Sequence, residues 1–161
     1  MRSSFPLDLL PTTSLPTGYS VRPLNSGDYN RSHLNVLSVL TLAPDVGEAA
    51  WVAQFDALGQ GSYYPIVIVE IASDQIVGTG TLFLERKFIR GLGLVGHIED
   101  IAVSKDAQGR GFGKTIITVL TELSEKLGAY KVRLSSFLSQ EDEFDIFDDV
   151  DYSGLRSEER R

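Results

Sequence analysis

Apolar and polar residues follow two different periods along this chain, and each change of period marks an expected strand or helix. Residues 19–24 alternate as a short strand, which Pro23 confines to a sheet edge or a strand end. Residues 34–40 and 46–58 carry apolar side chains at helical spacing and predict the first two helices. Asp28 is placed to cap the first of them.

The second half of the chain gives a stronger pattern. Residues 65–71 form a continuous apolar run of strand type, and residues 76–89 predict a long strand rich in β-branched side chains. Residues 94–103 predict the central strand. Residues 111–127 predict the longest helix because their apolar side chains share one face, and residues 130–134 predict a last strand.

The order β-α-α-β-β-β-α-β, with turns at residues 73–75 and 91–93, predicts an α+β fold in which a mostly antiparallel meander precedes a β-α-β crossover. A length of 161 residues, 42% of them hydrophobic and 23% charged, suits one globular domain. We expect that domain to span residues 15–134, after a disordered leader over residues 1–14.

Composition excludes several classes of protein. The chain has no cysteine, which excludes disulfides and thiolate metal sites and is compatible with the cytoplasm, where we expect the protein. No apolar run approaches the roughly 18 residues of a membrane span. The net charge of −7 argues against nucleic-acid binding. Most of this charge lies in residues 135–161, an acidic tail of a composition that is usually solvated and poorly ordered.

Glycines cluster where the expected central strand passes into the expected long helix. The run Gln108-Gly109-Arg110-Gly111-Phe112-Gly113 lets the main chain approach a ligand closely. The helix that begins there adds the positive end of its dipole, and Arg110 and Lys114 add charge, so the run predicts a pyrophosphate site. The spacing differs from the dinucleotide fingerprint G-x-G-x-x-G, and Gln108 stands where a P-loop needs its first glycine.

Q-x-x-G-x-G after a strand that ends in I-A-V resembles the coenzyme A pyrophosphate motif of the GNAT N-acetyltransferase superfamily. The segments His97-Ile98-Glu99-Asp100-Ile101-Ala102-Val103 and Glu85-Arg86-Lys87-Phe88-Ile89 resemble signatures of one branch, the glucosamine 6-phosphate N-acetyltransferases. The similarity runs over residues 15–134.

This resemblance implies the GNAT acyl-CoA N-acyltransferase fold, a mixed and mostly antiparallel sheet flanked by helices. In that fold the central strand and the strand after the long helix splay apart, and the thioester arm of acetyl-CoA, the co-substrate, enters the opening. The residues that the resemblance assigns to acetyl-CoA are Ile101, Ala102, Val103, Gln108, Gly109, Arg110, Gly111, Phe112, Gly113 and Lys114.

The implied reaction moves an acetyl group from acetyl-CoA to the amine of D-glucosamine 6-phosphate, in UDP-N-acetylglucosamine biosynthesis. An amine attacks only when unprotonated, so a carboxylate beside it binds the ammonium and assists in removing a proton. Glu99 and Asp100 are the adjacent candidates, and in a regular strand they point to opposite faces. Taken without the matched segment, the two acids are better interpreted as an ordinary acidic strand end, and the match to H-I-E-D-I-A-V is what favours the catalytic interpretation.

The resemblance also implies a homodimer whose second subunit supplies part of the sugar site. The substrate-binding residues that it assigns are Thr41, Lys87, Phe88, Ile89, Arg90, Glu99, Asp100, Tyr130 and Lys131, the last two from the second subunit. Arg90 stands where the family commonly has His. His33 and His97 have no carboxylates at ligand spacing, so we expect no metal site.

The resemblance stops after Leu134. Ser135-Ser136 replace an Asp-Cys pair, and nothing in the tail matches the family's N-x-x-F-Y-x-K-x-G-F series, its thiolate-protonating Tyr or its last strand. Three hypotheses therefore stand: an active enzyme with an unusual tail, a catalytically impaired or mis-spliced member that binds acetyl-CoA without efficient turnover, and a non-catalytic binding module whose tail contacts a basic partner.

Overall fold

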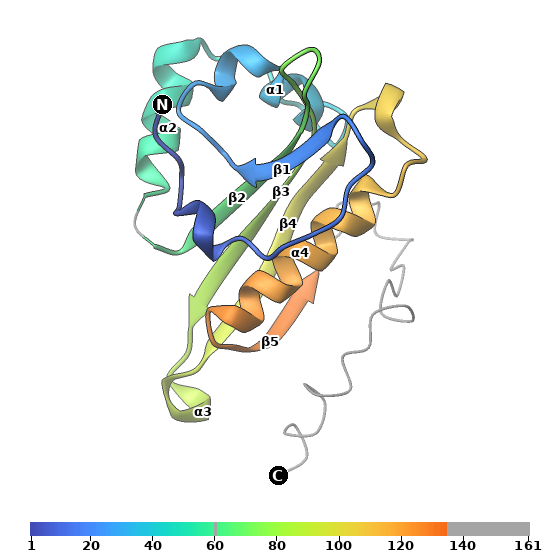
Figure 1. The fold of residues 1–161 in the computed structure, drawn as a ribbon. Coiled ribbons are helices and arrows are strands. Elements are labelled where there is room, and N and C mark those ends of the chain that lie inside the picture. Colours follow the sequence, from blue (N-terminus) through green and yellow to red (C-terminus); the bar gives the residue numbers. More distant parts are fainter. Residues whose placement is uncertain (60, 135–161) are drawn as a thin grey trace.

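The computed structural model describes residues 1–59 and 61–134, and its strands form a mixed sheet in chain order, β1 to β5 (Figure 1). Neighbouring strands are antiparallel except β4 and β5, which are parallel and joined by a helix. The predicted meander followed by a crossover is confirmed. The strands are β1 Tyr19–Pro23, β2 Tyr63–Glu70, β3 Gln75–Arg86, β4 Leu94–Val103 and β5 Ala129–Leu134.

Helices cover both faces of this sheet (Figure 1). The long crossover helix α4 lies on one face, and α1 and α2 lie on the other. The α-helices are α1 His33–Leu37, α2 Glu48–Ala57, α3 Ile89–Leu92 and α4 Phe112–Lys126, and the 3-10 helices are η1 Leu7–Leu9, η2 Asp28–Arg31 and η3 Lys105–Ala107. Among the described residues no helix is long and apolar enough to cross a membrane.

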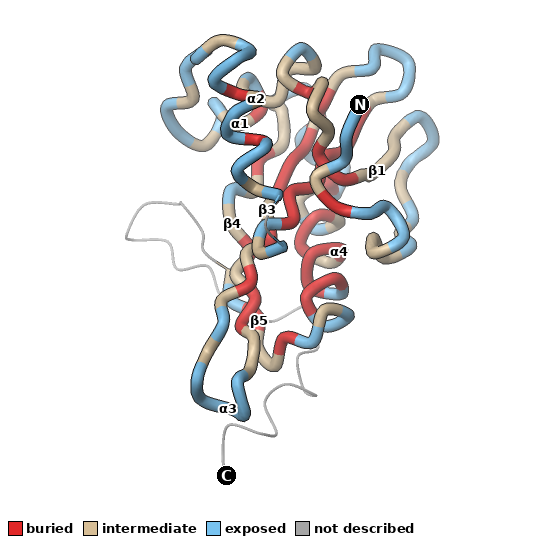
Figure 2. The backbone as a smooth tube through the Cα atoms, turned by 90° about the vertical axis from the view of Figure 1, so that its left-hand side faces the viewer, coloured by how far each residue is buried: buried red, intermediate tan, exposed pale blue. Residues whose placement is uncertain are grey.

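Strand β2 supplies apolar side chains to both faces. Ile66 and Ile68 pack with α4, whereas Val67 and Val69 pack with Trp51 of α2 and its neighbours. A strand buried on both faces is apolar at every position, which explains the unbroken run seen in the sequence. Figure 2 shows the buried residues concentrated along the inner side of α4 and the central strands.

Glycines in β3 and β4 let α4 approach the sheet closely. A Cβ at Gly80 would collide with the Ile116 side chain, and one at Gly96 would collide with Ser124. The Ser124 hydroxyl is buried and has no hydrogen-bond partner among the described residues. The helix therefore holds its depth against the sheet at the cost of burying a polar atom.

Strand β4 contains one extra residue opposite β3. Thr81 pairs with Glu99 and Thr79 with Ala102, so three steps along β4 match two along β3. Asp100 occupies the bulge with a left-handed backbone, φ 53°. Regular alternation of side chains through residues 99–101, expected from the sequence, is therefore wrong.

Residues 1–14 pack on the domain, so the expectation of a disordered leader is corrected. The Ser4 amide donates to the Leu24 carbonyl at 2.8 Å, and Phe5 is only 6% exposed. The Phe5 ring meets Tyr64 edge-on at a centroid distance of 5.3 Å. Burial of the Phe5 side chain therefore helps to fix residues 1–14 on the domain, although their composition predicts a disordered segment.

Asp28 is not the helix cap that the sequence predicted. It is fully buried in η2, where both Arg22 terminal nitrogens donate to its carboxylate at 2.8 Å and the Asn25 amide donates at 2.7 Å. The bidentate guanidinium compensates the buried charge. Ser32, with φ 67°, then separates η2 from α1, so the expected single helix is two short ones.

The β3 strand ends earlier than expected. Its last residue is Arg86, and the tip of the β3–β4 hairpin folds into the single turn α3. Arg90, Gly91 and Leu92 all have left-handed backbones there, so the tip cannot continue the strand.

The His33 ring is built into the α1–α2 layer as a neutral acceptor. The Trp51 indole N–H donates to His33 Nδ1 at 3.2 Å, and the two rings meet edge-on. Burial lowers the pKa of His33 from 6.5 to about 4, although the nearby Asp28 carboxylate acts in the opposite direction.

Acid should therefore destabilise the protein through His33. Between pH 6.5 and about 4 the unfolded chain binds a proton that folded His33 does not, so the free energy of unfolding falls as pH falls through this window. The expected loss is at most ~3 kcal/mol. Urea unfolding at several pH values should show a shallower acid loss for His33→Gln than for the wild type. An identical loss in both proteins would contradict this assignment.

Candidate active site

The predicted pyrophosphate cradle lies between the end of β4 and the start of α4. Gly109 and Gly111 both have φ 80°, and a Cβ placed on either would meet no heavy atom within 4 Å. The Gln108 side-chain amide donates to the Val103 carbonyl at 3.1 Å and ties the loop to the strand end. The loop therefore presents open backbone in a conformation that favours glycine.

The first turn of α4 completes this cradle. Gly111 is the N-cap, and its carbonyl accepts from both the Thr115 amide and the Thr115 hydroxyl at 3.0 Å. Amides of a helix N-terminus carry partial positive charge, and exposed Lys114 adds a full one. The structure thus brings the predicted residues 108–114 together in one turn at the start of α4.

Within residues 1–59 and 61–134, one edge of β4 has no strand partner next to the cradle. Parallel pairing with β5 ends at Ile98 opposite Leu134, so among the described residues Glu99–Val103 have no strand partner on that side. The predicted cofactor residues Ile101 and Val103 pack toward α4, and Ala102 packs on the opposite face. Their main chain offers hydrogen-bonding groups to an extended ligand that lies along the edge.

Both predicted catalytic acids lie where this open edge begins. Glu99 is half-buried opposite Thr81, on the sheet face away from α4, and Asp100 is exposed in the bulge. The acids therefore stand at the junction between the paired and unpaired parts of β4.

A basic cluster lies at the other end of the sheet. The Arg90 guanidinium carbon is 5.6 Å from the centroid of the Tyr130 ring, and Lys131 pairs with Val95. Lys87 lies six positions from Thr81 along β3, so roughly 20 Å of extended chain separates it from Glu99 at about 3.3 Å per residue. The structure brings Lys87, Arg90, Tyr130 and Lys131 together but does not bring them to the acids of the same chain.

The tip beside this cluster exposes apolar surface. Phe88 is 94% exposed, Ile89 64% and Leu92 71%. The exposed tip offers apolar area that burial against another protein surface would stabilise.

Comparison with known proteins decides the family. The model of the acetyltransferase (GNAT) family matches residues 33–143. This chain belongs to that family. A glucosamine 6-phosphate N-acetyltransferase of Candida albicans is 38% identical over 122 residues, which are 74% of this chain and 81% of the relative. The one from Schizosaccharomyces pombe is 47% identical over 73 residues, 45% of this chain and 66% of the relative.

Solved structures agree with the GNAT fold. A glucosamine-6-phosphate N-acetyltransferase from Arabidopsis thaliana superposes with a TM-score of 0.70 at 29% identity, over 73% of this chain and 82% of that one. An acetyltransferase from Trypanosoma brucei gives the same TM-score and coverage at 36% identity. The fold and family predicted from the glycine-rich motif are confirmed. GNAT acetyltransferases use acetyl-CoA.

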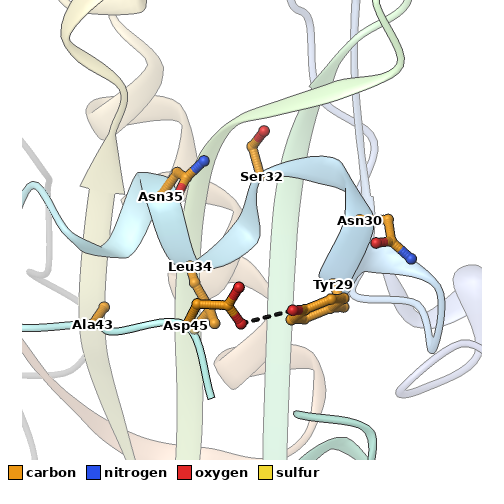
Figure 3. A pocket seen from close by; sticks show the side chains of 7 residues that line it. All are labelled: Tyr29, Asn30, Ser32, Leu34, Asn35, Ala43 and Asp45. Atoms are coloured by element: carbon orange, nitrogen blue, oxygen red, sulfur yellow. Dashed lines mark hydrogen bonds between the residues drawn. The ribbon is translucent and has the colours of Figure 1, made fainter. Parts of the chain in front are cut away.

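A polar pocket of about 260 Å³ lies beside α1 in this GNAT domain (Figure 3). The Tyr29 hydroxyl donates to the Asp45 carboxylate at 2.6 Å across it, and the Gly47 amide donates to the same oxygen at 2.9 Å. This pair anchors the loop that carries the predicted substrate residue Thr41, which is exposed just after α1. The sequence does not predict this pocket, because no local pattern links positions 29 and 45. The lining residues are Tyr29, Asn30, Ser32, Leu34, Asn35, Ala43 and Asp45.

Among the described residues no group of three or more His, Cys, Asp or Glu side chains is arranged to hold a metal ion. His97, expected to be an ordinary strand residue, lies in β4, with its Nε2 3.2 Å from Glu85 Oε1.

Lys87 is also held by Glu85, at 2.9 Å. The hydrogen bond from Lys87, and next that from His97, hold the pKa of Glu85 below its usual range. Glu85 thus joins the hairpin tip to the central strand through two side chains.

Removing the Lys87 ammonium should therefore raise the pKa of Glu85. In Lys87→Met the His97 contact remains, so the pKa should move upward without fully reaching 4.5. Carboxyl-carbon NMR titration measures this directly. Lys105→Met, which removes an exposed lysine of η3, is the control and should leave Glu85 unchanged. An unaltered Glu85 titration in Lys87→Met would show that the ion pair is absent in solution.

Proposed function

We propose that this chain transfers the acetyl group of acetyl-CoA to the amine of D-glucosamine 6-phosphate, giving N-acetylglucosamine 6-phosphate and CoA. The observation that carries this proposal is the continuity of one site: an anion cradle, an open strand edge and two carboxylates follow one another along β4 and the start of α4. The relatives named glucosamine 6-phosphate N-acetyltransferase support the choice of acceptor.

In this proposal residues 108–114 bind the pyrophosphate of acetyl-CoA, and Ile101, Ala102 and Val103 bind its extended arm through their main chain. The open edge supports this placement because an arm with amide groups can pair with a strand as an added strand does. A backbone amide of the same edge is then available to stabilise the oxygen of the tetrahedral intermediate.

Glu99 and Asp100 act on the amine. One carboxylate binds the substrate ammonium and accepts the proton that leaves it, so that the nitrogen lone pair is free. The nitrogen then bonds to the acetyl carbon and the carbon–sulfur bond breaks. The second proton of the nitrogen passes to the departing thiolate, so that the products are the amide and CoA as its thiol. Glu99 and Asp100 lie at the bulge where the part of β4 without a β5 partner begins, which supports their role.

We infer that the sugar phosphate binds to a second copy of the chain. Roughly 20 Å of strand separates Lys87 from Glu99, and one sugar ring with its phosphate is much shorter than this. A homodimer that lays the partner's hairpin tip near Glu99 supplies a basic group there and covers the exposed apolar tip. In this arrangement Lys87, Phe88, Ile89, Arg90, Tyr130 and Lys131 serve the partner's site, and Thr41 contacts the sugar from the same chain as Glu99.

We further propose that this reaction serves UDP-N-acetylglucosamine biosynthesis in the cytoplasm. The product, an N-acetylated hexosamine phosphate, is compatible with that pathway. The alternative is a member that binds acetyl-CoA without efficient turnover. The sequence supports that alternative because the family's Asn/Phe-Tyr/Gly-Phe series is missing after Leu134, in residues outside those that the structure describes.

Release of CoA from acetyl-CoA, followed with a thiol reagent in the presence of glucosamine 6-phosphate, tests the proposal. We expect turnover by the wild type and weaker acetyl-CoA binding by Gly111→Val, by at least about 10-fold, since a β-branched residue at φ 80° costs ~1–3 kcal/mol and fills the cradle. Gly128→Val is the matched control, because Gly128 has φ 92° at the opposite end of α4. Acetyl-CoA binding without CoA release would favour the impaired alternative.

The role of the two acids is tested separately. Glu99→Gln and Asp100→Asn should leave the Kd for acetyl-CoA unchanged, while the one whose carboxylate takes the proton should lower kcat by about 100-fold or more. Raising the pH should partly restore that variant, because free amine then forms without a base. Full activity in both variants would remove the carboxylates from the mechanism.

A further inference from the structure

Two aromatic residues join the cofactor cradle to the first strand of the sheet. Tyr19 begins β1, and its ring meets Phe112 edge-on with the centroids 4.8 Å apart. Phe112 is the first residue of α4 and is only 2% exposed. The Tyr19 ring is therefore fixed relative to the helix end that forms the cradle.

The same tyrosine holds Arg110. The Arg110 Nη1 donates to the Tyr19 hydroxyl at 2.6 Å, and the guanidinium carbon lies 5.7 Å from the centroid of the ring. These two contacts link residues 91 positions apart in the sequence. A short hydrogen bond and a cation–π contact together restrict an exposed side chain that otherwise samples many rotamers.

Two glycines with left-handed backbones flank Arg110. Gly109 and Gly111 both have φ 80°. The turn therefore sets the position of the Arg110 Cα atom, but it does not set the position of the guanidinium group at the end of the side chain. A guanidinium has five N–H donors. Among the described residues the Tyr19 hydroxyl is the acceptor that Arg110 uses, which leaves further donors for an anion.

We propose that Tyr19 is a positioning residue for acetyl-CoA: it holds the Arg110 guanidinium at the rim of the cradle, ready to donate to a phosphate oxygen. This inference rests on the proposed function. Tyr19 itself does not touch the phosphate. It lowers the entropic cost of binding because the charged group is ordered before the ligand arrives.

Calorimetric titration of acetyl-CoA into the full chain tests this. Tyr19→Phe keeps the ring against Phe112 and removes only the hydroxyl, and we expect its Kd to rise about 3- to 10-fold. Tyr64→Phe is the matched control, since it also removes a hydroxyl that makes a hydrogen bond, to the Gly61 carbonyl at 3.2 Å on a different element, and its Kd should stay unchanged. Thermal melting of each variant separates a binding effect from a loss of fold.

A double-mutant cycle gives a readout that a merely structural role of Tyr19 would not produce. In an Arg110→Gln background, Tyr19→Phe should have no further effect on the Kd. Titration with dephospho-CoA, which lacks the 3′-phosphate, identifies the phosphate that Arg110 contacts. If Tyr19→Phe still raises the Kd for this ligand, Arg110 contacts the pyrophosphate; if the effect of Tyr19→Phe disappears, Arg110 contacts the 3′-phosphate.

An unchanged or tighter Kd in Tyr19→Phe, or additive effects in the cycle, would overturn the inference and leave the proposed function standing. Failure of the wild-type chain to bind acetyl-CoA at all would instead overturn the proposed function and this inference with it.

Discussion

The extra residue at Asp100 in β4 is the constraint on which both the core and the site depend. It places Ile98 and Ile101, three positions apart, on the same face beneath α4, and it turns Ala102 to the α1–α2 layer. Without the extra residue, Ile101 and Ala102 would exchange faces of the sheet, and the packing against α4 and against the α1–α2 layer would both be lost. Asp tolerates the left-handed backbone better than most residues, so an acid at this position suits both the geometry and the proposed chemistry.

The depth of α4 then fixes the cradle. Gly78, Gly80 and Gly96 lie under the helix, and a side chain on Gly80 or Gly96 would push it outward. Because the first turn of α4 is also the proposed anion site, outward movement of the helix would carry the cradle away from the proposed cofactor edge of β4. The Ser124 hydroxyl finds no hydrogen-bond partner in the part of the chain that the structure describes, so close approach of the helix outweighs the cost of burying this polar atom.

Local patterns predicted the parts of the molecule that depend on local sequence. The bounds of β4 and, within a residue, of α4 follow from periodicity, and the glycine-rich turn follows from its own composition. Two of the missed features join distant positions, Phe5 with Tyr64 and Tyr19 with Arg110. The third, Asp28 with Arg22, spans six residues but has no pattern that identifies it. The bulge did have a signal, because apolar side chains at 98 and 101 break a period of two, but the run I-E-D-I-A-V was interpreted as a regular strand.

The rigidity of the sheet bears on the dimer proposed above. The carboxylates lie near the middle of β4 and the basic cluster lies at one end of β3 and β4, which pair from Gly78 to Arg86. A paired strand does not shorten, and no hinge within such a ladder brings its ends together. Two-fold symmetry removes the difficulty, because antiparallel placement of identical chains sets the basic end of each beside the acidic centre of the other. The rigid sheet keeps the carboxylates and the basic cluster apart within one chain. In the proposed dimer, the same rigidity aligns the carboxylates of one chain with the basic cluster of the other.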